Sequence, residues 1–451
     1  MSVFKFNSIL FESGWKKDIY ITTNSKGKIE SIDEIHKKAD YNIELAIPGF
    51  QNAHSHAFQY AMAGIAEYHP INKQADNFWS WRNAMYNLAL NIDPDQMEAI
   101  ATMLYSEMLK NGYTNVAEFH YLHHDKNGKS YNNVAETGER LVAAAKNAGI
   151  NITLVPIFYQ KGGFNSPSNE QQKRFISKNI DHYINLLEKS KEICSNHSHA
   201  KLGMGIHSLR AVERNEIIEA NKYNKNNLPF HIHVSEQLIE VDECIKHWGA
   251  RPVEWLLKNI NINEQHHLVH ATHLNKDEIE SLAKSNANVV ICPITEGNLG
   301  DGIFPLTEYQ EHNGNWSIGS DSHINLSPLE EIRLLDYGQR LISHNRNTFA
   351  NNISGNSSIN SFNQMWFNGK KAMGSKREHY FEIDESLDFL EIDNNHHLIQ
   401  STNNKHILNT VIYSLDSKII KETYINGKST KTSKTVENNF KKAIEEIEIR
   451  N

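Results

Sequence analysis

The stretch that decides the fold is Ile47–Gln59, IPGFQNAHSHAFQ. An apolar run and a Pro48-Gly49 turn lead into a short predicted strand that carries His54 and His56. Side chains two residues apart on a strand point to the same face, so both imidazoles can reach one ion. Neutral imidazole is a common ligand of zinc and related metals. A His-x-His pair also occurs in ordinary surface loops, so the metal hypothesis needs further ligands elsewhere.

A strand-then-helix pattern follows this stretch. Asp93 as N-cap, Pro94 in the first turn and Gly112 as a stop predict a helix over 94–111. Further helices are expected over 136–148 and 253–258. Seven more strands are expected over 114–121, 152–159, 202–209, 229–234, 267–271, 288–293 and 316–321. Eight strands alternating with helices predict a (β/α)₈ barrel. An open doubly wound sheet is the alternative, but no Gly-x-Gly-x-x-Gly follows the first strand.

The two ends of the chain have a different character. Strand-like pieces are expected over 4–11, 18–24, 27–32, 387–393, 406–415 and 421–429, and an amphipathic helix over 436–450. We therefore expect a small β-sandwich domain built from residues 1–47 and 384–451, beside a barrel over 48–383. The segment 343–375 is rich in Asn, Ser and Gly and is expected to be a long loop, ordered or mobile.

Composition excludes several classes of protein. The 451 residues carry a formal charge of −8, and no aromatic-interleaved basic patch predicts nucleic-acid binding. Cys194, Cys244 and Cys292 are too far apart for a disulfide framework, which fits a reducing, cytoplasmic location. We expect no membrane association, because neither a signal peptide nor a run of about 18 apolar residues is present.

Polar residues at the predicted strand ends complete a metal site. The active site of such a barrel lies at the carboxyl ends of its strands. Three histidines and one aspartate at these ends fit a single divalent cation with a position left for water. The predicted ligands are His54, His56, His233 and Asp321. Zinc is our first choice, although iron, manganese, cobalt and nickel accept similar ligands.

Each assignment has an alternative. His231 shares a face with His233, and we choose His233 because it is nearer the strand end and Glu236. Glu236 is either a solvated carboxylate at a helix start or, beside a metal-bound water, a proton shuttle. His270 is either a core residue or a hydrogen-bonding partner of the attacking water. Asp321 is either a helix cap or a ligand.

A second metal is not expected. In binuclear barrels of this type a modified lysine at the end of the fourth strand bridges the two ions. Here that strand ends in His207-Ser208-Leu209-Arg210. Lys201 lies at the opposite end of the strand and Lys161 follows the third strand, so the sequence predicts a mononuclear site.

Several longer motifs are more specific than the metal ligands. They read NAHSHAFQYAMAG, DNFWSWRNAMY, VAEFHYLHH, HIHVSEQ, RPVEWLL, LVHATHL, CPITEGNLGDGIFP and GSDSHINLSPLEEIRLLDYGQR. Together they resemble the aminohydrolase branch of the amidohydrolase superfamily, over residues 47 to about 341. Two departures are Gly297, where the family more often has alanine, and the loosely matched segment 343–393.

The resemblance implies hydrolysis of N-formimidoyl-L-glutamate to N-formyl-L-glutamate and ammonia, a step of histidine degradation, by a homodimer. It implies that Glu236 shuttles the proton while His270 and Asp321 orient the nucleophile. The implied substrate-binding residues are Gln59, Arg82, Tyr121, His207 and Arg210. The residues themselves support the two arginines, because arginine is the natural bidentate partner of a substrate with two carboxylates.

Arg82 also has simpler interpretations. It can be a surface charge on an amphipathic helix, or serve a neighbouring subunit, but Phe78, Trp79 and Trp81 favour a half-buried position. The rival function is deamination of guanine, cytosine, an adenosine derivative or a triazine, which requires ring stacking and no pair of arginines. The second rival is an inactive metal-containing binding protein, against which the complete set of ligands with Glu236 and His270 argues.

Overall fold

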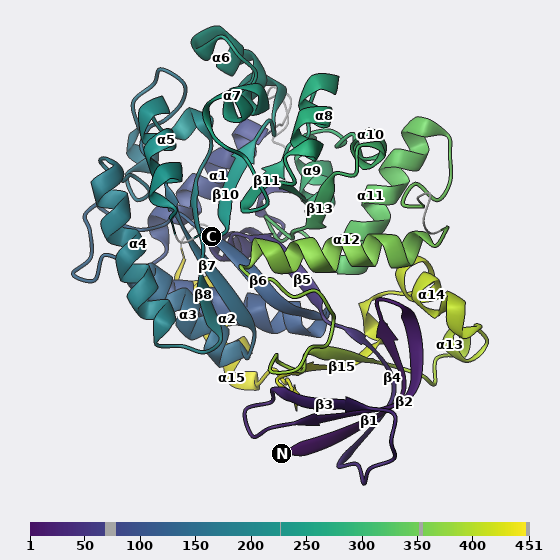
Figure 1. Cartoon of the computed structure of the whole chain (residues 1–451). Helices are drawn as coiled ribbons and strands as arrows, with labels where there is room; N and C mark the ends of the chain where they lie inside the picture. Colours follow the sequence, from purple (N-terminus) through teal and green to yellow (C-terminus); the bar gives the residue numbers. More distant parts are fainter. Residues whose placement is uncertain (68–77, 226, 351–354, 448–451) are drawn as a thin grey trace.

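The computed structural model describes residues 1–67, 78–225, 227–350 and 355–447; the side chain of Trp79 lies outside the described part. Figure 1 shows a barrel surrounded by helices and, below it, a smaller sheet to which both ends of the chain contribute. Among the described helices, none has the length and apolar character needed to cross a bilayer.

The barrel sheet contains all eight predicted strands, paired in parallel. Its strands are β5 (Phe50–Ser55), β6 (Tyr113–His120), β7 (Asn151–Phe158), β8 (Ala200–Leu202), β9 (Met204–Ile206), β10 (Phe230–Val234), β11 (His266–His270), β12 (Asn288–Ile291) and β13 (Asn315–Ile318). The order runs from β5 to β13 around the barrel, with β8 paired beside the path to β7. The fourth predicted strand is divided into β8 and β9 at Gly203. The predicted (β/α)₈ fold is confirmed.

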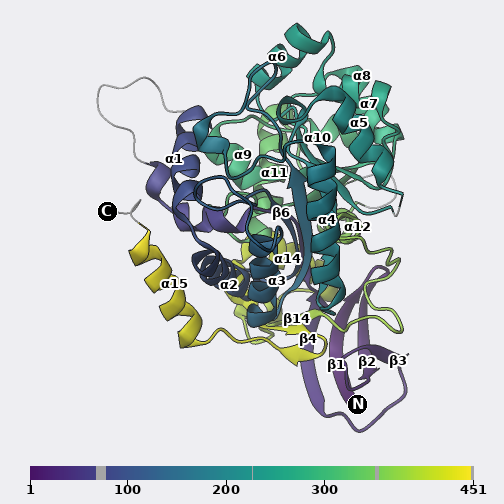
Figure 2. The ribbon, with the colours of Figure 1, turned by 90° about the vertical axis from the view of Figure 1, so that its left-hand side faces the viewer.

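Helices cover the outside of this sheet (Figures 1 and 2). They are α1 (Phe78–Asn91), α2 (Pro94–Lys110), α3 (Glu136–Ala148), α4 (Ile180–Ser195), α5 (Arg214–Tyr223), α6 (Leu238–Trp248), α7 (Pro252–Asn259), α8 (Lys276–Lys284), α9 (Pro293–Leu299), α10 (Leu306–Glu311), α11 (Pro328–Ser343) and α12 (Ser357–Ala372). The three helices expected from the sequence are confirmed as α2, α3 and α7. Helix α2 begins with a capping box in which Asp93 accepts from the Gln96 amide at 2.8 Å.

The barrel closes where the first and last strands meet. The Asp321 amide donates to the His54 carbonyl at 3.1 Å, and the His56 amide donates to the Asp321 carbonyl at 3.3 Å. Gly319 makes this approach possible, since a Cβ there would lie 2.6 Å from the Cβ of His54. Closure therefore brings the ends of β5 and β13 into direct contact.

The smaller sheet joins the two ends of the chain. Its strands are β1 (Ser2–Phe11), β2 (Gly14–Thr23), β3 (Ile29–Asp33), β4 (Tyr41–Pro48), β14 (Phe389–Ile392), β15 (Ile420–Ile425) and β16 (Lys428–Ser429). The strand order is β16-β15-β14-β4-β1-β2-β3, in which only β1 and β4 pair in parallel. The expected small β domain built from both chain ends is confirmed.

One predicted strand is a helix. Residues 406–415 form α14 (Ile407–Ser414), which packs against α11 and α12. Its buried residues Ile407, Leu408, Val411 and Ile412 lie on one helical face. A short run of apolar and β-branched residues is compatible with a buried helix as well as with a strand. The prediction of a strand over 406–415 is therefore wrong. The region also contains α13 (His397–Gln400) and α15 (Lys434–Glu446). Helix α15 confirms the predicted terminal helix and lies alongside α2 (Figure 2).

The prediction of a long loop over 343–375 is wrong for residues 357–372, which form helix α12. This helix buries Phe362, Met365 and Trp366, and Gly369 lets it approach Gln51 of β5 closely. The Asn- and Ser-rich composition concealed the helix because some of these polar residues lie inside. Asn368, for example, is buried and donates to the Trp316 carbonyl at 3.2 Å.

Replacing Gly319 with alanine is expected to destabilise the protein, because the new methyl would push β13 away from His54. Such overpacking typically costs about 1–3 kcal/mol. Gly297→Ala is the matched control: among described atoms its Cβ would meet only Leu334 Cδ2, at 3.6 Å, and alanine favours the helix by up to about 1 kcal/mol. Denaturant unfolding measures both variants. A Gly319→Ala protein as stable as wild type would contradict the close approach.

Candidate active site

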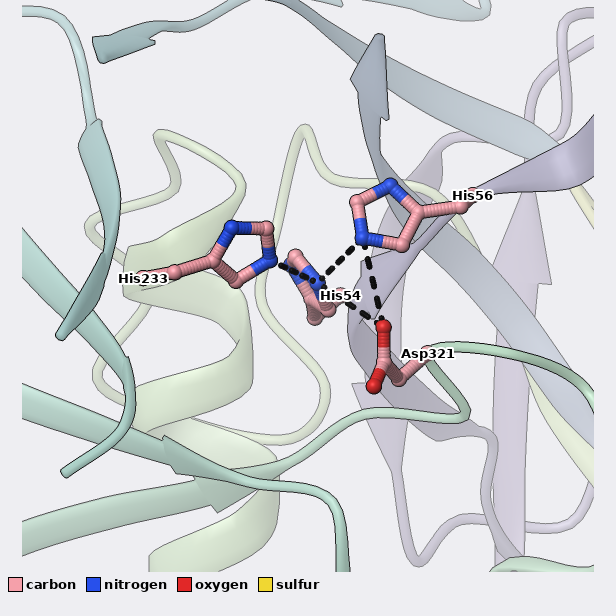
Figure 3. Close-up of side chains that lie close together, drawn as sticks. All are labelled: His54, His56, His233 and Asp321. Atoms are coloured by element: carbon pink, nitrogen blue, oxygen red, sulfur yellow. Dashed lines mark hydrogen bonds and ion pairs between the residues drawn. The ribbon is translucent and has the colours of Figure 1, made fainter. Parts of the chain in front are cut away.

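Four buried side chains converge at the carboxyl end of the barrel (Figure 3). The Nε2 atom of His54 lies 3.1 Å from Nε2 of His56 and 3.0 Å from Nε2 of His233. Asp321 Oδ1 lies 3.3 Å and 3.2 Å from the Nε2 atoms of His54 and His56. The structure thus brings together the complete predicted ligand set.

The outer ring nitrogens fix how these imidazoles face. His56 donates from Nδ1 to the Phe119 carbonyl at 2.9 Å, and His233 donates from Nδ1 to the His207 carbonyl at 3.1 Å. Each bond leaves the Nε2 lone pair directed into the cluster. Burial and the neighbouring His56 lower the pKa of His54 to about 3, which keeps this imidazole neutral. Three imidazole nitrogens and a carboxylate oxygen fit a divalent transition metal.

His231 lies apart from this cluster. Its Nε2 donates to the carbonyl of Ala372 at 2.9 Å, at the end of α12. Burial lowers the pKa of His231 to about 4, so the ring is neutral. Of the two histidines on β10, the structure therefore places His233 among the potential ligands and His231 in the packed interior.

Glu236 and His270 lie beside the cluster. The Nε2 atom of His270 is 3.7 Å from Glu236 Oε1 and 3.9 Å from Asp321 Oδ2. Burial lowers the pKa of His270, but the carboxylates of Glu236, Glu296 and Asp321 outweigh burial and raise it to about 10. His270 and Asp321 have φ angles of +68° and +45°, a conformation that side-chain-bearing residues seldom adopt. The strand ends are thus bent to turn these side chains inward.

A cavity opens from the cluster, with a volume of about 510 Å³ when its open mouth is included. Its lining includes all five predicted substrate-binding residues, Gln59, Arg82, Tyr121, His207 and Arg210, together with Glu236 and His270. Phe78 and Trp81 also line it, and Arg82 comes from α1 of the same chain.

The polar side chains of the cavity differ in whether they have interaction partners within the protein. Gln59 Nε2 donates to the Tyr121 hydroxyl at 3.0 Å, while Gln59 Oε1 has no partner among the described residues. Arg82 lies over the ring of Tyr86, 5.4 Å from its centroid. Within the described chain Arg210, in the short 3₁₀ turn Leu209–Ala211, has neither a hydrogen bond nor an ion pair within 4 Å. An acceptor and a guanidinium are thus available to a ligand.

Sequence reasoning missed residues that support the site. Glu118 on β6 accepts hydrogen bonds from Ser55 Oγ and the Ala57 amide, both at 2.6 Å, and from the Tyr105 hydroxyl at 3.0 Å. Burial raises the pKa of Glu118 to about 7 against these bonds. This carboxylate holds the turn that presents His56. A charged residue within a buried parallel strand was the feature that could have identified it.

Tyr86 and Tyr159 were also missed, although Tyr86 ends the DNFWSWRNAMY motif that contains Arg82. Both line the cavity. Gln172 Nε2 donates to the hydroxyls of Tyr86 at 3.1 Å and of Tyr159 at 2.9 Å. This bridge fixes the two rings beside the arginines.

The sequence of this chain matches that of a known protein family. The model of the amidohydrolase family matches residues 45–429. The chain belongs to the amidohydrolase family. Its members depend on a divalent metal, and the four converging side chains form a group that can hold one here.

Individual relatives agree with this membership. The chain is 42% identical over 355 residues to formimidoylglutamate deiminase of Pseudomonas aeruginosa, covering 77% of this chain and 76% of that protein. An amidohydrolase structure from Brucella melitensis has a TM-score of 0.93 at 36% identity, covering 99% of this chain and all of that one. An adenosine deaminase from Xanthomonas campestris with bound zinc, at 18% identity, has a TM-score of 0.80 over 99% and 98% of the two chains and shares the fold.

His233→Gln is expected to abolish metal binding, because it removes one of the converging nitrogens. His231→Gln is the matched control, since it alters the neighbouring inward-facing histidine but no ligand. Elemental analysis after dialysis against a trace of zinc measures metal per chain. Loss of metal in the His231 variant with retention in the His233 variant would reverse the assignment.

Proposed function

We propose that this protein hydrolyses N-formimidoyl-L-glutamate to N-formyl-L-glutamate and ammonia, in histidine degradation. The observation that carries the proposal is that Arg82 and Arg210 line the same cavity as the metal ligands. A substrate with two carboxylates requires two such cations, whereas a neutral ring does not. The 42% identity to formimidoylglutamate deiminase of Pseudomonas aeruginosa supports the same substrate.

We propose zinc as the metal, held by His54, His56, His233 and Asp321. Three imidazoles and one carboxylate are ligands that zinc accepts, and the related adenosine deaminase structure contains zinc. When bound, such an ion lowers the pKa of a water molecule toward about 7.

Glu236 is proposed to move the proton. Its carboxylate lines the cavity, 3.7 Å from His270. It accepts a proton from the attacking water and returns it to the nitrogen that leaves as ammonia. Water adds to the formimidoyl carbon and the bond from this carbon to the terminal nitrogen breaks. The second water proton, lost from the hydroxyl of the adduct, passes to the same nitrogen, so that ammonia leaves and the formyl group remains. His270 and Asp321 orient the water, and His270 stabilises the tetrahedral state by hydrogen bonding.

The remaining cavity residues are proposed to hold the substrate. Arg82 and Arg210 bind its two carboxylates in charge-assisted pairs. Gln59, Tyr121 and His207 contact the formimidoyl end and the chain between. Gln59 Oε1, which has no partner among the described residues, suits an N–H donor of the formimidoyl group.

We also propose a cytoplasmic homodimer. All three cysteines are buried and unpaired, as expected in a reducing compartment. The dimer is expected from the family resemblance. Light scattering of the purified protein measures its mass, and a monomer would remove this part of the proposal.

Zinc-loaded protein is expected to release ammonia from N-formimidoyl-L-glutamate and none from guanine or cytosine. A coupled ammonia assay measures all three substrates. Ammonia from a ring substrate alone would overturn the proposed substrate and leave the metal site intact. No release from any substrate by metal-loaded protein would favour a binding protein.

Arg82→Met and Arg210→Met are each expected to raise KM for N-formimidoyl-L-glutamate. Losing one charge-assisted contact costs about 1.5–3 kcal/mol, or roughly 10- to 150-fold. Arg214→Met is the matched control, because this exposed guanidinium stacks on Trp248 outside the cavity. Equal KM values in all three variants would contradict recognition by two arginines.

A further inference from the structure

The carboxylate of Glu296 lies behind His270, and the proposed reaction assigns it no role. Glu296 belongs to α9, within the CPITEGNLGDGIFP stretch, and is 3% exposed. Its Oε1 lies 3.2 Å from His270 Nδ1 and 2.8 Å from the amide nitrogen of Cys292. One oxygen therefore serves both a backbone group and the imidazole.

These two contacts determine which way the His270 ring faces. A backbone amide can only donate, so Glu296 Oε1 accepts from Cys292. An ionised carboxylate oxygen also accepts from the ring, which places a hydrogen on His270 Nδ1. The opposite nitrogen, Nε2, then faces Glu236 and Asp321.

No other contact fixes the ring so closely. The distances from Nε2 to Glu236 and Asp321, 3.7 and 3.9 Å, exceed hydrogen-bonding range. His233 stacks on the ring with centroids 5.5 Å apart, a contact that is the same in both orientations related by a 180° rotation about the His270 Cβ–Cγ bond. Among the described residues, Glu296 provides the one hydrogen bond to the His270 ring.

We propose that Glu296 is a positioning residue that fixes the ring orientation of His270, with Nδ1–H directed to its carboxylate and Nε2 toward Glu236. It acts through His270, since it is not among the residues that line the cavity. The inference rests on the role proposed above for His270 in the reaction. A carboxylate or carbonyl that orients a functional histidine in this way typically contributes about 10- to 100-fold to activity.

Glu331 provides the matched control. It is fully buried, and its Oε2 accepts from the Ile294 amide at 2.9 Å, so it supports the start of the same helix. No contact joins it to His270 among the described residues. Glu331→Gln therefore alters a buried carboxylate under α9 without changing the hydrogen bond to the ring.

The kinetic test compares Glu296→Ala, Glu296→Gln and Glu331→Gln on N-formimidoyl-L-glutamate. Alanine removes the acceptor and is expected to lower kcat about 10- to 100-fold with KM unchanged. Glutamine keeps a carbonyl oxygen in place and is expected to restore most of kcat. Glu331→Gln is expected to keep wild-type kcat. Wild-type kcat in Glu296→Ala, or an equal loss in Glu331→Gln, would overturn the proposal.

A substrate-free test separates this inference from the proposed function. In zinc-loaded protein labelled with ¹⁵N-histidine, the His270 Nδ1–H resonance is identified by its loss in His270→Asn. It is expected to persist in Glu296→Gln and Glu331→Gln and to disappear in Glu296→Ala; Glu296→Leu replaces an alanine variant that fails to fold. Persistence without an acceptor at position 296 would overturn the inference. The expected NMR result without ammonia release would retain the positioning role and reject only the substrate.

Discussion

Three imidazole nitrogens and one carboxylate oxygen meet in the buried end of the barrel, where His54 Nε2 lies 3.0–3.3 Å from the other three atoms. Neutral imidazoles with inward lone pairs repel one another unless a cation lies between them. The arrangement therefore depends on metal binding, and metal binding depends on three strand ends meeting in space. Carbonyls of the neighbouring segments, at Phe119 and His207, hold two of the rings in the required orientation.

Different structural elements supply the reactive residues of the cavity and its two arginines. The ligands, Glu236 and His270 lie on barrel strands or directly after their ends. Helix α1 and the turn after β9 contribute Arg82 and Arg210, which line the same cavity. Substrate selection can thus change in the loops while the reactive end is conserved in geometry. Strained backbone at His270 and Asp321 is the cost of aiming both residues at one point.

The sequence predicted the barrel strands and the metal ligands, because both depend on the local pattern of apolar and polar residues. Each barrel strand is a short apolar run, and the ligand histidines directly follow or end such runs, so their convergence followed from barrel topology. Helix α14 was missed because its short run of apolar and β-branched residues is also typical of a strand, and α12 because its polar residues are partly buried. Glu118 and Glu296 were missed because their partners, Ser55 and His270, lie 63 and 26 residues away and meet only in the folded barrel.

X-ray absorption spectroscopy of the metal in the purified, zinc-loaded protein tests the central claim most directly. Four ligands from His54, His56, His233 and Asp321 predict one metal per chain and scattering from nitrogen and oxygen at about 2.0–2.2 Å. Cys292, His270 and Asp321 form a second group of potential ligands. A sulfur shell at about 2.3 Å, or a second metal nearby, would contradict the mononuclear three-histidine centre.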